Sequence, residues 1–214
     1  MKADLHNHAY VTWEQGSLSL QRGPRTLEYI ANLAMRRGID LLGITSHGED
    51  DHRFRALKQT ANELPPHFEY SDLGSIVRVT SYREGAMKTV TIARTRTVPT
   101  KQGDVLLIGK EVPFEDRKDI TDTLKRAKGL GMITVAEHMF VAKAGGIGEK
   151  VFEQNAEYFD AIELNGQARR NDNERACTYA IQTQKPLIAN SDSHTPRDVG
   201  RCSTSYDRGH FICY

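Results

Sequence analysis

The chain has few cysteines, no long apolar run and almost no net charge. Its three cysteines, Cys177, Cys202 and Cys213, form no Cys-x-x-Cys pair, so they predict reduced thiols rather than a disulfide framework or a zinc knuckle. No apolar run approaches the roughly 20 residues that cross a bilayer, and the start, MKADLHNH, lacks the apolar segment of a secretory signal. The net charge of +1 selects neither a nucleic acid nor a membrane as partner. These absences predict a cytoplasmic protein, and its 214 residues predict a single domain, 1–214.

The apolar pattern alternates between short strand-like runs and longer segments with a helical period. Strands are predicted over residues 3–8, 39–47, 104–112, 132–138, 161–166 and 186–194, and helices over 25–38, 53–64, 119–131, 148–159 and 173–184. Strand and helix in alternation predict parallel strands joined by crossover helices. Six or seven such units favour a closed α/β barrel, although periodicity alone leaves an open sheet as an alternative.

The segment over residues 74–104 breaks this rhythm. It alternates like antiparallel strands and predicts an inserted β-hairpin. Its basic residues outnumber Glu84, and they are Arg78, Arg83, Lys88, Arg94, Arg96 and Lys101. Two interpretations are open: a two-stranded excursion with a solvated basic face, or an electrostatic guide for phosphate-bearing substrates.

Histidines gather where the predicted strands end. Residues i and i+2 of a strand point to the same side, so the pair in ADLHNHAY can face one point. Five of the eight histidines lie at carboxyl ends of strands, together with one aspartate: His6, His8, His47, His138, Asp192 and His194. In a closed parallel barrel these ends meet at one mouth, where active sites are built. The pattern therefore predicts a shared metal site.

The predicted ligands are nitrogen and oxygen atoms without a thiolate. Such a set suits zinc, manganese or iron and disfavours calcium. It exceeds what a single tetrahedral zinc needs, so two or three adjacent divalent ions are expected. Such a centre supports metal-assisted hydrolysis of a phosphoester. No Ser-His-Asp order, nucleophile elbow or Walker loop offers a competing chemistry.

Five separated segments resemble, in order and spacing, the PHP (polymerase and histidinol phosphatase) family. They are DLHNH, GIDLLGITSHGEDD, VAEHMF, DAIELNGQARRNDNERA and NSDSHTPRDVG. The resemblance implies a distorted (β/α)7 barrel with two or three metal ions and phosphoesterase activity. By motif, the implied ligands are the paired His6 and His8, then His47, His138, and the terminal pair Asp192 and His194.

Several positions depart from the family pattern. Ser46 stands where the family usually has aspartate, and Met139 follows His138 where proline is usual. Glu14 is the nearest candidate for the acidic ligand that the family places after the paired histidines. Two registers are open for the bridging glutamate of the third strand. Either IGKEV supplies Glu111, or this segment lies after the glutamate strand and Thr95 or a neighbour occupies the acid's position.

Three arginines beside the last two motifs are candidates for binding substrate phosphate. They are Arg169, Arg170 and Arg197, and a planar guanidinium can grip two phosphate oxygens. Ordinary surface ion pairs are the alternative for each. Asn165 is a candidate for a weak ligand or for orienting a water molecule.

The sequence therefore predicts a metal-dependent phosphoesterase. The expected substrate is a nucleotide or a short oligonucleotide with a terminal phosphate, followed by a small phosphomonoester. The alternative is a catalytically weakened barrel that binds metal or nucleic acid as an accessory module. Ser46 and the uncertain bridging glutamate motivate that alternative.

Overall fold

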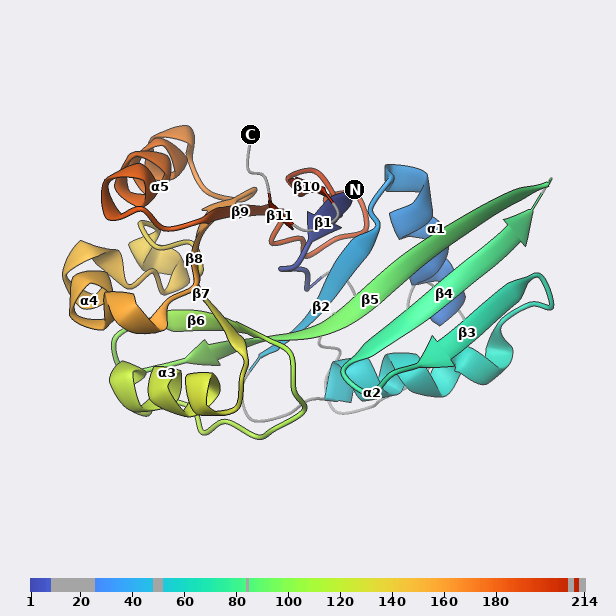
Figure 1. Ribbon diagram of the computed structural model, residues 1–214, viewed down its shortest axis with the longest axis horizontal. Coiled ribbons are helices and arrows are strands. Elements are labelled where there is room, and N and C mark those ends of the chain that lie inside the picture. The colour runs from blue at the N-terminus through green and yellow to red at the C-terminus, as the bar shows by residue number, and fades with distance from the viewer. Residues whose placement is uncertain (9–25, 48–51, 84, 208–209, 212–214) are drawn as a thin grey trace.

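The structure is a computed structural model that describes residues 1–8, 26–47, 52–83, 85–207 and 210–211. It is a mixed α/β fold built on a nearly closed, barrel-shaped sheet (Figure 1). The strands are β1 (Lys2–Asp4), β2 (Leu41–His47), β3 (Phe68–Asp72), β4 (Ile76–Arg83), β5 (Ala86–Pro99), β6 (Asp104–Ile108), β7 (Ile133–Ala136), β8 (Ala161–Asn165), β9 (Leu187–Asn190), β10 (Thr204–Asp207) and β11 (His210–Phe211). The α-helices are α1 (Leu27–Arg37), α2 (His52–Gln59), α3 (Ile120–Gly129), α4 (Gly148–Asn155) and α5 (Arg170–Thr183).

The strands follow the order β11-β10-β1-β2-β5-β6-β7-β8-β9. β1, β2 and β5 are parallel neighbours, and so are β7, β8 and β9. β6 runs antiparallel to both β5 and β7. The first and last barrel strands meet where Asn7 forms a parallel bridge with Ser193 and the Leu5 amide donates to Asn190 Oδ1 over 2.7 Å. The barrel therefore departs from a regular all-parallel (β/α)7 arrangement at β6.

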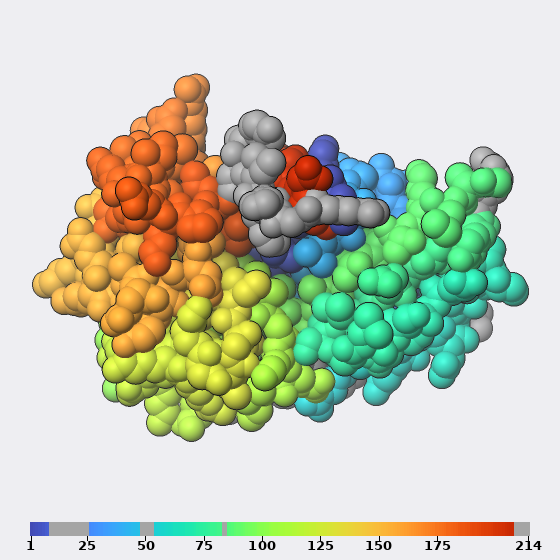
Figure 2. Space-filling view, viewed as in Figure 1, coloured from blue at the N-terminus to red at the C-terminus, as the bar shows by residue number. Residues whose placement is uncertain are grey.

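Helices cover the outside of the sheet in two groups. α1 and α2 pack over β2, β4 and β5 through a core that includes Leu27, Ile30 and Phe54. α3, α4 and α5 pack over β6, β7 and β8 through a second core around Leu124 and Phe152. Figure 2 shows these two parts of the surface, with β3 to β5 on the right and α3 to α5 on the left.

The barrel interior holds a separate, small apolar cluster. Leu106, Val135, Ala161 and Ile188 come from four adjacent strands, β6 to β9. Because side chains alternate along a strand, residues two positions further on face the same interior. The apolar cluster therefore lies deeper in the barrel, and the polar residues described below lie on the same inner face, nearer the mouth.

Local sequence signals explain where the helices begin and end. The Thr26 hydroxyl accepts a hydrogen bond from the Tyr29 amide at the start of α1, and Gly38 ends it in the left-handed conformation, with φ of 69°. The Asp119 carboxylate accepts from the Thr121 amide at the start of α3. Both helices lie within the ranges expected from the sequence.

Residues 74–104 form part of the barrel and not only a hairpin. β4 and β5 do pair antiparallel, as the alternation predicts, and β3 extends this pair. β5 is also the third barrel strand. It pairs in parallel with the whole of β2, from Leu41 to His47. The segment is therefore built into the wall, which differs from the inserted excursion expected.

The basic side chains that the structure describes in this segment, which do not include Arg83, divide into two kinds. Arg78, Lys88 and Lys101 are exposed. Arg94 and Arg96 are buried, and their guanidinium groups donate to the backbone carbonyls of Lys110 and Val112. These two arginines hold the segment after β6, so they do not contribute to a solvated basic face.

Within the described parts of the chain, none of the helices combines the length and the apolar character that a membrane crossing requires.

Candidate metal centre

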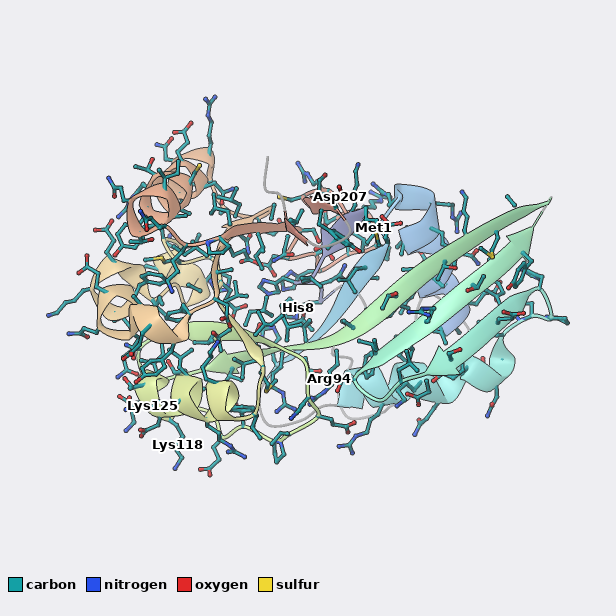
Figure 3. The ribbon with its side chains drawn as sticks, viewed as in Figure 1. Met1, His8, Arg94, Lys118, Lys125 and Asp207 are labelled. Atoms are coloured by element: carbon teal, nitrogen blue, oxygen red, sulfur yellow. The ribbon has the colours of Figure 1, made fainter. Side chains whose placement is uncertain are left out.

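His6 and His8 follow β1 along the chain, and Figure 3 shows His8 inside the ring of strands. Both are buried, and their Nε2 atoms are 2.9 Å apart. His6 Nδ1 is 2.8 Å from the Glu163 carboxylate on β8. A carboxylate orients an imidazole by accepting a hydrogen bond from its Nδ1–H, which leaves Nε2 as the nitrogen that can bind a metal ion. The pair thus points into the centre of the barrel as the i, i+2 spacing predicts.

The rings of His47 and His194 both lie against the ring of His8. The His47 and His8 rings stack with centroids 4.2 Å apart and an interplanar angle of 6°, while the His194 and His8 centroids are 4.9 Å apart. His194 Nδ1 is 2.9 Å from the Asp192 carbonyl oxygen. A carbonyl only accepts, so Nδ1 carries the proton and Nε2 is available as a ligand. Three histidines from β1, β2 and the segment after β9 therefore gather at one place.

His138 and Asp192 follow β7 and β9 in unusual backbone conformations. Their φ angles are 32° and 48°, and they are two of the four non-glycine residues with positive φ in the described ranges. Such conformations cost on the order of 1–3 kcal/mol and cluster at functional sites. The His138 amide donates to Glu163 Oε2 over 2.8 Å, and Asp192 Oδ1 lies 3.4 Å from His6 Nε2. The strain therefore accompanies the turns that bring both residues to the centre.

The structure adds three carboxylates that the sequence reasoning did not select. Glu137 Oε2 lies 3.2 Å from His6 Nε2, and Glu163 is paired with His6 on the opposite side of the ring. Asp104, the first residue of β6, lies beside Glu137 and His138. Glu163 lies two positions before Asn165, the last residue of β8, within the motif DAIELNGQARRNDNERA. Because residues i and i+2 of a strand face the same side, this spacing from Asn165 is the sequence signal that identifies Glu163 as a candidate.

Asparagine and threonine side chains hold these carboxylates in place. Asn165 Nδ2 donates to Glu163 over 3.0 Å and to Asp192 over 3.1 Å. Asn190 Nδ2 donates to the other Glu163 oxygen over 2.9 Å, and Thr97 on β5 donates to Glu137 Oε2 over 2.9 Å. Asn165 thus positions two carboxylates, a different role from the weak ligand expected.

Buried opposite charges set the protonation of the centre. Burial alone would lower the pKa of His6, but the Glu163 and Glu137 carboxylates raise it to about 10. Burial acts to raise the pKa of Glu163, but the charges of His6 and His138 and the hydrogen bonds from His6 and Asn165 together lower it to about 2. Burial raises the pKa of Glu137 well above its usual value, against the opposing effect of His6. Without metal, His6 and Glu163 therefore form a buried imidazolium–carboxylate pair.

The arrangement fits divalent cations. Three groups have one ligand atom from each member within 4.8 Å of the others: His8, His47 and His194; His6, His8 and Asp192; and Asp104, Glu137 and His138. Glu137 Oε1 and His138 Nδ1 are also buried without a hydrogen-bond partner. Buried polar atoms are ordinarily paired, and a bound cation would give the Glu137 oxygen a partner. The nitrogen and oxygen donors suit zinc, manganese or iron.

Residues 170–211 match the family model PHP_C, described as PHP-associated. The match confirms the resemblance to the PHP family. It covers a small C-terminal part of the chain, from α5 through Asp192 and His194 to β11. A search of the curated proteins found no match.

The other residues that the resemblance to the PHP family suggests as ligands either lie away from the histidine cluster or fall outside the residues that the structure describes. The Glu111 side chain is 38% exposed and forms an ion pair of 2.5 Å with Arg55 at the surface, which differs from the bridging position. The barrel strand beside β2 is β5, with Thr97 opposite His47, which corresponds to the register without a third-strand acid. Thr95 faces Thr45, with hydroxyl oxygens 2.7 Å apart. Glu14 lies outside the described residues.

The three candidate phosphate-binding arginines are exposed. Arg170 forms an ion pair of 2.7 Å with Glu174 one helical turn further along α5, which matches the surface alternative. Arg169 immediately precedes α5, and the Arg197 carbonyl accepts from Arg37. A role for Arg169 and Arg197 in binding phosphate stays a prediction.

The raised pKa of His6 makes metal binding to the PHP-like centre depend on pH. A histidine ligand must be deprotonated, and metal-free His6, with a pKa of about 10, holds its proton at neutral pH. Binding must therefore expel at least one proton, and apparent affinity should rise about tenfold per pH unit between about pH 6 and pH 8. Isothermal titration calorimetry with zinc in two buffers of different ionisation enthalpy measures the proton release. Binding with no proton released would contradict the assignment of His6 as a ligand.

Proposed function

We propose that the protein is a metal-dependent phosphoesterase. The observation that carries the proposal is the convergence of His6, His8 and Asp192, from opposite ends of the chain, with ligand atoms 2.9 to 3.6 Å apart. The family to which the chain is similar is usually metal-dependent. Divalent ions held among the ligands His6, His8, His47, Asp192 and His194 would polarise phosphoryl oxygens and lower the pKa of water at the site.

The chain's own residues would prepare the site for this chemistry. Glu163 fixes the His6 ring through Nδ1, and Asn165 fixes Asp192. Held by these partners, the ligands need little rearrangement when an ion arrives, which favours affinity. His194 is 63% exposed whereas His6 is 1% exposed, so the histidine cluster runs from the barrel interior to its surface. A substrate phosphate would approach from the exposed side.

The proposed substrates are phosphomonoesters or phosphodiesters, first among them a nucleotide or a short oligonucleotide with a terminal phosphate. Two exposed cations, Arg169 and Arg197, are next to segments that lead to the centre. Arg94 and Arg96 are committed to backbone carbonyls, so the basic segment offers less support for a polynucleotide than its composition suggests. A small phosphomonoester is therefore the next candidate within this class.

Metal removal and reloading test the proposal. Protein stripped with a chelator should hydrolyse no aryl phosphate, and added manganese or zinc should restore release of p-nitrophenol. A panel of nucleotides, 5′-phosphorylated oligonucleotides and sugar phosphates would then rank the substrates by kcat/KM. Metal-loaded protein that turns over no phosphoester in the panel would refute the enzyme proposal.

The alternative function is a metal- or nucleic-acid-binding accessory barrel. Two observations favour it: Ser46, buried beside His47, supplies no carboxylate, and Thr97 stands at the level of His47 on the third strand. Stoichiometric metal without turnover would be the result that selects this alternative.

A further inference from the structure

Asp104, the first residue of β6, forms a ligand group with Glu137 and His138, which directly follow β7, next to the histidine cluster. One ligand atom of each lies within 4.8 Å of the others. β6 is antiparallel to its neighbours, with Pro99 opposite Asp104 and Leu106 opposite Val135. The first residue of β6 therefore lies at the edge where β5 and β7 end. The reversal of one strand brings a carboxylate to the mouth from a position that would lie at the far end in a parallel barrel.

Glu137 lies between this group and the paired histidines. Its Oε2 atom is 3.2 Å from His6 Nε2 and 3.9 Å from His138 Nε2, and it accepts the Thr97 hydroxyl over 2.9 Å. The side chain is 0% exposed, and Oε1 has no hydrogen-bond partner. A buried carboxylate oxygen without a partner is costly. A cation on the Oε1 side would satisfy it.

Asp104 is held on the other side of the group. Its amide donates to the Gly145 carbonyl over 2.8 Å. A Cβ atom at Gly145 would lie 2.3 Å from Asp104 Oδ2, and this glycine has φ of 90°. The loop after His138 thus packs directly against the Asp104 carboxylate, which only glycine permits. The packing of this loop therefore fixes the position of Asp104.

We propose that Glu137 is a shared ligand of two divalent ions. One ion is bound on the side of His6, His8 and Asp192, and the other by Glu137, Asp104 and His138. The inference rests on the proposed metal centre and adds its bridging carboxylate. β5 presents Thr97 at this level, so the carboxylate is supplied from β7, two strands further along the sheet. Two carboxylates and one imidazole form a harder ligand set than His8, His47 and His194, so manganese suits this second position better than zinc.

Manganese binding tests the inference independently of activity. Apo protein would be titrated with Mn²⁺, and free Mn²⁺ would be followed by electron paramagnetic resonance for the wild type, Glu137→Gln and Asp104→Asn. We expect each variant to lose one tight Mn²⁺ per chain relative to wild type. Two ions sharing a carboxylate lie about 3.5–4 Å apart, so the loaded wild type should show an exchange-coupled signal that Glu137→Gln abolishes.

Controls separate the inference from the proposed function. Glu115→Gln removes a glutamate that is 64% exposed and paired with Lys118, and it should bind Mn²⁺ like the wild type. If Glu137→Gln does not fold by circular dichroism, Asp104→Asn decides on the same readouts. Wild-type stoichiometry and coupling in the folded variants would overturn the inference and leave the proposed function standing. A wild type that binds neither Mn²⁺ nor Zn²⁺ would overturn both.

Discussion

Replacing His8 with alanine is expected to abolish phosphoesterase activity and to remove bound metal. His8 belongs to two of the three ligand groups. Its Nε2 is 2.9 Å from that of His6, and its ring stacks on His47. Truncation therefore removes a donor that an ion in either group would need. Residues that only orient a ligand change affinity or activity by about 10–100-fold, and the loss for His8→Ala should exceed about 100-fold.

The measurement is the initial rate of p-nitrophenol release, paired with elemental analysis of the same sample. His67→Ala is the matched control, because His67 precedes β3 and packs on Phe68, away from the barrel strand ends. It should keep both its rate and its metal. His8→Ala with wild-type rate and metal content would show that the histidine cluster is not the site of catalysis.

Gly43→Ala is expected to destabilise the protein strongly. A Cβ atom at Gly43 on β2 would lie 2.3 Å from the backbone oxygen of Leu5 and 2.6 Å from its carbonyl carbon. Backbone atoms cannot rotate away as a side chain does, so the chain after β1 would have to move off β2. Overpacking typically costs about 1–3 kcal/mol, and we expect about 3 kcal/mol or more, equivalent to a Tm lower by roughly 10 °C.

The control for this variant is Gly129→Ala near the end of α3. Apart from its chain neighbours and its own helix backbone, no atom of the described residues lies within 4 Å of a Cβ built there, and alanine favours a helix over glycine by up to about 1 kcal/mol. Thermal unfolding followed by circular dichroism should show opposite shifts for the two substitutions. Equal Tm values for Gly43→Ala and wild type would mean that β1 and β2 are further apart than described. Since Leu5 precedes His6, Gly43→Ala should also weaken zinc binding.

Much of the centre could be predicted because its histidines follow strands whose ends are marked in the sequence. His6 and His8 share a face through the period of two, and His47 directly ends β2. Such local rules need only the strand direction and its last residue. The histidine cluster is therefore found from sequence without any knowledge of the strand order.

Asp104 and Glu137 could not be found in the same way. The expectation of uniformly parallel strands placed Asp104 at the wrong end of its strand, because the reversal of β6 is a tertiary feature with no local signal. Glu137 adjoins His138, and alternation predicts that such neighbours face opposite sides. The positive φ of His138 breaks that alternation and lets both residues face the centre. Glu111 is the opposite case. It has the expected Gly-x-Glu motif just after a strand, yet its side chain forms an ion pair with Arg55 at the surface.

Anomalous X-ray diffraction from crystals grown with zinc or manganese tests the central claim most directly. The account predicts peaks within about 2.0–2.2 Å of ligand atoms of His6, His8 and Asp192. Peaks confined to surface sites, with His6 still hydrogen-bonded to His8, would contradict it.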